Sequence, residues 1–176
     1  MIVFRHGDPS FPFLWEDASQ PPARWHGVAD GPAQYLADTP DGAWAEFLRH
    51  EEIKDPADLA TVRRAIWAVD LPDEPALLPA LPERTLLGGT ASYPACQAEA
   101  RRLRALGAKR IVAPSAALVA GGAAGQRVDG GLRSATPRDG KVIVLFGRRP
   151  DLTGWAAAIE ARPPDDLLLW VRHFKP

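Results

Sequence analysis

The sequence predicts an α+β fold, in which mixed, mostly antiparallel strands are flanked by helices. Strand-like and helix-like segments are mixed without regular β-α-β alternation, which argues against a doubly wound parallel sheet. The chain shows no internal repeat. Its 176 residues, 46% of them hydrophobic, carry a formal net charge of -1. This length and composition predict one soluble globular domain over residues 1–176, with a single core.

Short runs rich in β-branched, aromatic and leucine residues predict the strands. Residues 141–146 and 167–174 are apolar enough to be buried strands. The expected strands cover residues 2–5, 34–37, 64–69, 109–113, 141–146 and 167–174.

Three segments predict helices. Thr39-Pro40 pairs a good N-cap with proline at the first helical position, so a helix is expected to run from there to about Glu52. Its apolar residues fall on one arc, and Glu46 lies at the edge of that arc. A short helix is expected over residues 56–63. A longer one is expected over 92–106, closed by a glycine at position 107.

Three other segments predict loops. Residues 7–22 are rich in proline and cannot continue a helix or a central strand. Residues 71–82 are punctuated by proline, and residues 121–131 hold five glycines. Long loops in compact domains are often functional, so the first and the last of these are candidates to close over a ligand.

Composition excludes several classes of protein. The single Cys96 and four scattered histidines give no zinc-binding spacing, so no metal is expected. The N-terminus does not resemble a signal peptide, and no apolar stretch reaches the roughly 18 residues of a membrane span. Interspersed acids and bases argue against direct nucleic-acid binding, and the glycine-containing segments match no nucleotide-binding motif. We therefore expect a cytoplasmic protein.

Polar residues that suit a binding site recur at a regular spacing in the first third of the chain. Arg24, Tyr35 and Glu46 are separated by 11 residues each, and Arg24 is followed by Trp25-His26. Much later, Pro114-Ser115 places a serine just beyond the end of an expected strand.

These residues resemble the RES domain family, which is named for its Arg, Glu and Ser. The resemblance rests on Arg24-Trp25, on Tyr35-Leu36-Ala37, on Ala43-Trp44-Ala45-Glu46 and on Pro114-Ser115. An early strand arginine is met by Arg5, a helical glutamine by Gln97, and a late Leu-Phe strand end by Leu145-Phe146. One departure is His26, where the family commonly has asparagine.

The resemblance implies a fold similar to the ADP-ribosyltransferases and a toxin of a bacterial toxin-antitoxin pair. Family members consume NAD or transfer ADP-ribose to a protein, so NAD is the expected substrate. The expected partners are an antitoxin of the helix-turn-helix type and, where ADP-ribose is transferred to a protein, that target protein. Self-association is compatible with the sequence but is not indicated by it.

The resemblance also assigns roles to the matching residues. Glu46 is expected to stabilise the cationic ribose that forms when NAD loses nicotinamide, because a carboxylate suits an oxocarbenium-like centre. Arg24 and Arg5 are the candidates to hold the diphosphate or the adjoining ribose. Tyr35 is expected to contact nicotinamide or the sugar, and Ser115 the ribose or the amide. Trp25 and His26 complete the expected NAD-binding set.

Each assignment has a structural alternative. The arginines are ordinary in a chain with 17 of them, and Glu46 on a helix flank is by default solvated or paired with Arg49 or His50. Tyr35 and Trp25 fit a core, and Ser115 fits the cap of a turn. Three functions stay open: an NAD-consuming enzyme with water, phosphate or protein as acceptor, a partner-binding protein without activity, and a serine hydrolase at Ser115. The last lacks the GxSxG motif.

Overall fold

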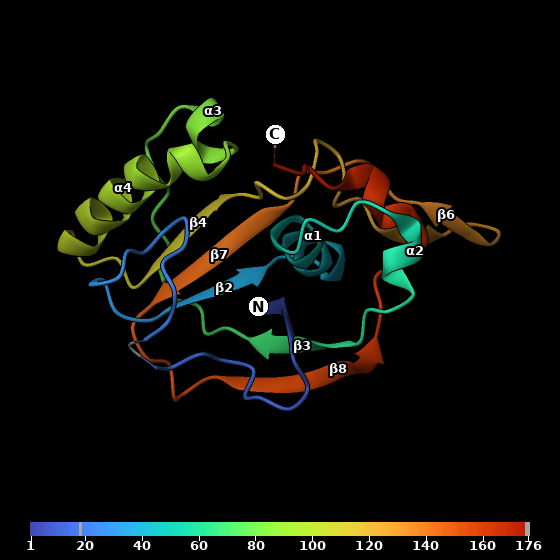
Figure 1. Ribbon diagram of the computed structural model, residues 1–176, viewed down its shortest axis with the longest axis horizontal. Coiled ribbons are helices and arrows are strands. Elements are labelled where there is room, and N and C mark those ends of the chain that lie inside the picture. Colours follow the sequence, from blue (N-terminus) through green and yellow to red (C-terminus); the bar gives the residue numbers. More distant parts are fainter. Residues whose placement is uncertain (18, 175–176) are drawn as a thin grey trace.

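A six-stranded sheet forms the centre of the computed structural model, which describes residues 1–17 and 19–174. The strand order is β4-β7-β2-β1-β3-β8, and every neighbouring pair is antiparallel (Figure 1). These strands are β1 (Ile2–Gly7), β2 (Ala33–Ala37), β3 (Arg64–Asp70), β4 (Arg110–Pro114), β7 (Lys141–Phe146) and β8 (Thr153–Ala161). A separate hairpin joins β5 (Gln126–Val128) to β6 (Leu132–Ser134).

The helices lie along the chain between these strands. The longest are α1 (Pro40–His50) and α4 (Tyr93–Ala105), and Figure 1 shows α1 nearly end-on, between β2 and β3. The shorter ones are α2 (Pro56–Leu59), α3 (Glu83–Leu86) and the 3₁₀ turns η1 (Thr90–Ser92) and η2 (Asp165–Trp170). No helix of the described residues is long and apolar enough to cross a membrane.

The two faces of the sheet are distinguished by strand alternation, since successive side chains point to opposite sides. Phe4 pairs with Ala37, and Tyr35 pairs with Val144, so these residues share one face. The buried residues on this face pack against α1 or α4, and we call it the helix face. The opposite side is called the loop face, and its core residues are Val3, Leu36, Val69, Leu71, Ile143 and Leu145.

Helix α1 begins at the residue that the sequence predicts. The Thr39 side chain accepts a hydrogen bond from the Gly42 amide at 3.0 Å, and Pro40 occupies the first turn. The apolar arc of α1 then packs on the helix face with Ala37 and Ile66. This packing fixes the rotation of α1 and therefore the direction in which Glu46 points.

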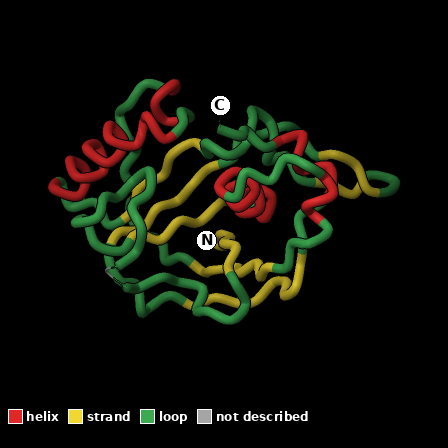
Figure 2. Tube along the Cα trace, viewed as in Figure 1, coloured by secondary structure: helices red, strands yellow, loops and turns green. Residues whose placement is uncertain are grey.

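Loop residues cover the loop face. Residues 8–17 and 19–32 form no helix or strand (Figure 2). Phe13 from this segment stacks on Trp67, with ring centroids 5.2 Å apart. A Cβ at Gly154 of β8 would lie 3.0 Å from the Phe13 ring, so the glycine makes room for it. The proline-rich segment is thus part of the packing of the domain.

The predicted α+β class is confirmed, and one predicted strand is wrong. Residues 165–170 form the 3₁₀ turn η2, and the following Val171 makes only an isolated bridge to Leu118. The apolar run Leu167-Leu168-Leu169 has no alternation, so its composition cannot distinguish a strand from a helical turn. Pro164 immediately precedes the turn, where its fixed φ suits a helix start.

Strand β8 and the β5–β6 hairpin are absent from the sequence prediction. Strand β8 reads TGWAAAIEA, and alanine and glycine are depleted in strands, so composition gives no signal for it. The expected loop 121–131 instead contributes β5 to the β5–β6 hairpin, whose six strand residues are all exposed. The predicted helix at 56–63 is shorter, because only residues 56–59 are helical.

Candidate active site

A cavity of about 180 Å³ lies on the helix face, between α1 and the start of α4. This is smaller than the roughly 300–1,000 Å³ of sites that enclose a whole drug-sized ligand, so it suits one part of a larger molecule. Its walls are formed by Phe4, Arg5, His6, Ala23, Arg24, Trp25, Tyr35, Leu36, Ala37, Ala43, Glu46, Arg49, His50, Tyr93, Pro114, Ala116 and Val142.

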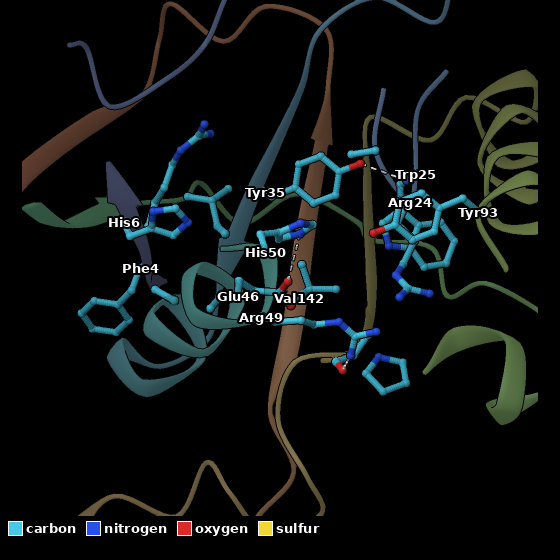
Figure 3. A pocket seen from close by; sticks show the side chains of 17 residues that line it. Phe4, His6, Arg24, Trp25, Tyr35, Glu46, Arg49, His50, Tyr93 and Val142 are labelled. Carbon is cyan, nitrogen blue, oxygen red and sulfur yellow. Dashed lines mark hydrogen bonds and ion pairs between the residues drawn. The ribbon is translucent and has the colours of Figure 1, made fainter. Parts of the chain in front are cut away.

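Glu46 is the one carboxylate among the residues that line this cavity. It lies on α1 and its side chain is 25% exposed. The Ser115 hydroxyl donates to Oε1 at 3.4 Å, and His50 Nε2 lies 3.8 Å from Oε2 (Figure 3). The carboxylate is therefore positioned from two sides and remains accessible from the cavity.

Arg24 lies at the end of the cavity beside Tyr93 (Figure 3). It is 8% exposed, and its guanidinium carbon lies 5.0 Å from the centre of the Tyr93 ring. Its Nη1 donates to Ser92 Oγ at 3.0 Å and to the Thr85 carbonyl at 3.3 Å, and its Nη2 donates to the Gly88 carbonyl at 2.6 Å. Arg24 thus connects the cavity wall to the chain between α3 and α4.

Arg49 is a second guanidinium at the cavity, which the sequence analysis considers only as a surface partner of Glu46. It is 3% exposed and donates to the Ala116 carbonyl, to the Arg172 carbonyl at 2.9 Å and to the Gly88 carbonyl at 2.9 Å. Burial lowers the pKa of its guanidinium. The sequence feature that could have indicated Arg49 is its position three residues after Glu46, because this spacing places both side chains on one side of α1.

Tyr35 reaches the cavity from the helix face of β2. Its hydroxyl accepts a hydrogen bond from the Trp25 amide at 2.9 Å and lies 3.0 Å from His26 Nδ1. Burial raises the pKa of Tyr35, so the phenol stays neutral. Tyr35 therefore supplies an uncharged aromatic wall and positions the turn that carries Arg24.

The other end of the cavity is aromatic and holds a neutral imidazole. Figure 3 shows Phe4 and His6 there, with Tyr35, His50 and Glu46 between them and Arg24. The His6 ring packs 5.3 Å from the Phe47 ring. Burial, reinforced by neighbouring cations, lowers the pKa of His6 to about 3, so the ring is neutral near pH 7.

The structure brings Arg24, Trp25, Tyr35 and Glu46 together at one cavity, as the sequence analysis expects. Trp25 is 1% exposed and belongs to the core under α4 as well as to the cavity wall. Tyr93 also lines the cavity, although it lies 47 positions beyond Glu46 in the sequence. The packing of α4 places it there, and no local sequence pattern predicts this.

The side chains of the expected residues Arg5, His26 and Ser115 lie elsewhere. Arg5 is among the residues that line the cavity, but it alternates with Phe4 and His6. Its guanidinium therefore points to the loop face, where it donates to Gln34 Oε1 at 2.6 Å. His26 is 1% exposed, lies behind Tyr35 and does not line the cavity.

Ser115 lies behind Glu46. Its hydroxyl accepts hydrogen bonds from the Ala117 and Leu118 amides at 3.2 and 3.3 Å, which is the turn-capping role that the sequence analysis gives as an alternative. Its contact with Glu46 makes it a support for the carboxylate.

The electrostatics of the cavity favour an anionic ligand with a positively charged or electron-poor centre. Two guanidiniums at one end suit phosphate oxygens, and the single carboxylate of Glu46 suits a cationic centre beside them. The aromatic end suits a planar ring. Among the described residues, no cluster of His, Cys, Asp and Glu is arranged to hold a metal ion.

Comparisons with known proteins add family and fold. The model of the RES domain matches residues 3–166. A solved structure, described as the M. tuberculosis MbcT-MbcA toxin-antitoxin complex, matches with a TM-score of 0.58 and 16% sequence identity, over 96% of this chain and 86% of that one. At this identity the likeness shows the fold alone. The search of curated proteins found no match.

Proposed function

Since the chain belongs to the RES domain family, we propose that it is an NAD-consuming toxin of a toxin-antitoxin pair. In this proposal the cavity binds the nicotinamide riboside part of NAD and cleaves its nicotinamide-ribose bond. The proposed machinery is Glu46 with Arg24, Arg49 and Tyr35. NAD is the substrate and no metal takes part.

The observation that carries the proposal is the position of Glu46 between unlike ends of one cavity. Its carboxylate lies between the guanidinium of Arg24 and the neutral ring of His6 (Figure 3). NAD has the same order of groups, because its ribose stands between a diphosphate and a planar nicotinamide. Bound in this order, the ribose lies beside Glu46.

The chemistry then follows from charge. As the bond between ribose C1′ and the pyridine nitrogen breaks, its electron pair neutralises the pyridinium, and positive charge develops on the ribose ring. The Glu46 carboxylate stabilises this charge at short range in a partly desolvated site. An acceptor oxygen then forms the new bond to C1′, and when that oxygen carries a proton, as water does, the proton passes to the solvent. Water, phosphate and a protein side chain remain the proposed alternatives for the acceptor.

The partners in this proposal are an antitoxin and, if ADP-ribose goes to a protein, a target protein. The solved relative is described as a toxin-antitoxin complex, which supports an antitoxin for this chain too. We propose a helix-turn-helix antitoxin, as the family resemblance implies.

Nicotinamide release from NAD tests the proposal. We expect Glu46→Gln to lower the rate at least about 100-fold, the usual scale for losing a group that stabilises transition-state charge. Glu51→Gln is the matched control, because Glu51 follows α1 and is exposed. Reactions with and without phosphate distinguish phosphorolysis from hydrolysis. Activity that survives in Glu46→Gln contradicts the assignment.

The alternative of a partner-binding protein without activity has one observation in its favour. The hydrogen bonds of Arg24 and Ser115 described above are made within the protein, as expected of residues that only hold the fold together. This alternative predicts no nicotinamide release from the wild-type chain, and no ADP-ribose incorporation when labelled NAD is incubated with cell lysate. Either product contradicts it.

A further inference from the structure

Arg24 and Arg49 reach one carbonyl oxygen from two separate parts of the chain. Arg24 precedes β2 and Arg49 lies on α1, yet both Nη2 atoms donate to the Gly88 carbonyl, at 2.6 and 2.9 Å. Gly88 lies between α3 and η1, in the segment of residues 85–92 that accepts hydrogen bonds from both arginines.

The two guanidiniums are buried without a carboxylate acceptor among the described residues. Every acceptor found for them is neutral: the carbonyls of Thr85, Gly88, Ala116 and Arg172, the Ser92 hydroxyl and the Cys96 sulfur. The charge of Glu46 offsets part of the burial of Arg49. Burying two like charges whose hydrogen bonds all go to neutral groups is nevertheless costly, because neutral dipoles replace hydration only in part. An anion at the shared position offsets this cost.

We propose that Arg24 and Arg49 together form a binding site for a phosphate group, which the Gly88 carbonyl fills in the free protein. A phosphate oxygen takes the place of this carbonyl between the two Nη2 atoms and so releases residues 85–92. For the ligand to be the diphosphate of NAD, this inference rests on the proposed function. The assignment of Arg49, rather than Arg5, as the second guanidinium of the site does not rest on the proposed function.

The segment 85–92 depends on hydrogen bonds from Arg24 and Arg49 for part of its stability. Helix α3 has only four residues, too few to be stable without its neighbours. Arg24 alone binds this segment at three points, Thr85, Gly88 and Ser92. Loss of the Gly88 contact therefore removes a bond to each arginine at once.

Amide hydrogen exchange of the wild-type chain is the first test. With ADP-ribose, which has the diphosphate, we expect exchange in residues 85–92 to become at least about threefold faster. Inorganic phosphate at millimolar concentration gives the same change if a single phosphate group suffices, and no change if the diphosphate is required. Nicotinamide riboside, which has no phosphate, leaves exchange unchanged. Unchanged exchange with both saturating ADP-ribose and phosphate overturns the inference.

Substitution of Arg49 is the second test. We expect Arg49→Gln to weaken ADP-ribose binding at least about tenfold, as for a lost charge-assisted hydrogen bond, and nicotinamide riboside binding less than about twofold. Arg127→Gln, on the exposed β5–β6 hairpin, is the control and changes neither. Equal weakening of both ligands assigns Arg49 to packing and contradicts the inference.

A glycine pair keeps the test informative if Arg49→Gln does not fold. A Cβ at Gly88 would lie 2.9 Å from the Arg84 carbonyl and 3.0 Å from Ser92 Cβ, whereas one at Gly89 meets only Phe174, at 3.7 Å. Gly88→Ala must therefore displace the segment, and Gly89→Ala need not. We expect faster exchange in residues 85–92 without ligand for Gly88→Ala only. Equal exchange in the two variants contradicts the inference.

The failure of this inference is distinguishable from the failure of the proposed function. NAD cleavage without any response of residues 85–92 to ADP-ribose refutes the phosphate site and leaves the enzyme standing. A response to ADP-ribose or to phosphate, with neither nicotinamide release by the purified chain nor ADP-ribose incorporation in cell lysate, establishes the phosphate site and refutes the enzyme.

Discussion

The two faces of the central sheet hold their arginines in different ways. Beside the helix face, Arg24 and Arg49 reach cavity walls and share the Gly88 carbonyl. On the loop face, Arg5 donates to the side chain of Gln34, which is fully buried. The first pair lines the cavity together with Glu46, whereas the guanidinium of Arg5 shares Gln34 Oε1 with the Trp15 amide of the proline-rich loop. A guanidinium in this chain is therefore informative about function only once its face of the sheet is known.

The largest expected difference between the faces is in catalysis. We expect Arg24→Gln to lower nicotinamide release at least about 100-fold, because it removes a charge at the cavity. The same change at Arg5 is expected to alter the rate less than about threefold, since that guanidinium points away from the cavity. Steady-state rates of the two variants, with thermal unfolding as a check on folding, measure this difference. Equal losses of activity contradict the division of roles.

The loop face is expected to show its role in stability. Gln34 Oε1 accepts hydrogen bonds from Arg5 at 2.6 Å and from the Trp15 amide at 3.1 Å, and Gln34 Nε2 donates to the Trp15 carbonyl. Gln34→Leu leaves Arg5 without this partner and is expected to lower the free energy of unfolding by about 2–3 kcal/mol.

A double-mutant cycle isolates this pair. Adding Arg5→Leu removes the unpartnered charge, so the double variant is expected to recover about 1 kcal/mol relative to the sum of the two single changes. Urea unfolding of the four proteins measures both quantities. Strict additivity of the two changes contradicts an interaction between Arg5 and Gln34.

The sequence predicts most of the sheet because local chemistry there agrees with tertiary structure. Strand β7 is found over the predicted residues 141–146, and α1 begins at its predicted cap. The errors fall where local preference is weak. The alanine-rich β8 has no compositional signal and is a strand through its pairing with β3. The apolar run of η2 fits a strand and a helical turn equally well, and in the fold only Val171 makes a bridge, to Leu118. Pairing between distant segments decides such elements.

The candidate site shows the same limit at the level of single residues. The regular spacing of Arg24, Tyr35 and Glu46 does lead to one cavity. Strand alternation, which was available from the sequence, already places Arg5 opposite its neighbour His6. Tyr93 was not accessible in this way, because its position depends on how α4 packs on the sheet.

The smallest expected difference between the faces is in pH dependence. Arg5 on the loop face has its pKa lowered by burial to about 10, so it stays charged at neutral and acidic pH. His6 on the helix face has a folded pKa of about 3, below the ordinary 6.5. The unfolded chain therefore binds more protons between pH 6.5 and 3, and the folded state loses stability as the pH falls through this range.

From pH 7 to 5, His6 is expected to cost the fold about 1–2 kcal/mol. His6→Phe keeps an aromatic ring beside Phe47 and removes the titrating group. From pH 7 to 5, the unfolding free energy of this variant is therefore expected to fall by about 1–2 kcal/mol less than that of the wild type. Urea unfolding at pH 7 and pH 5 compares the two proteins. Both retain the other histidines, so only the difference between their slopes reports on His6. Parallel pH profiles contradict a buried neutral imidazole at this end of the cavity.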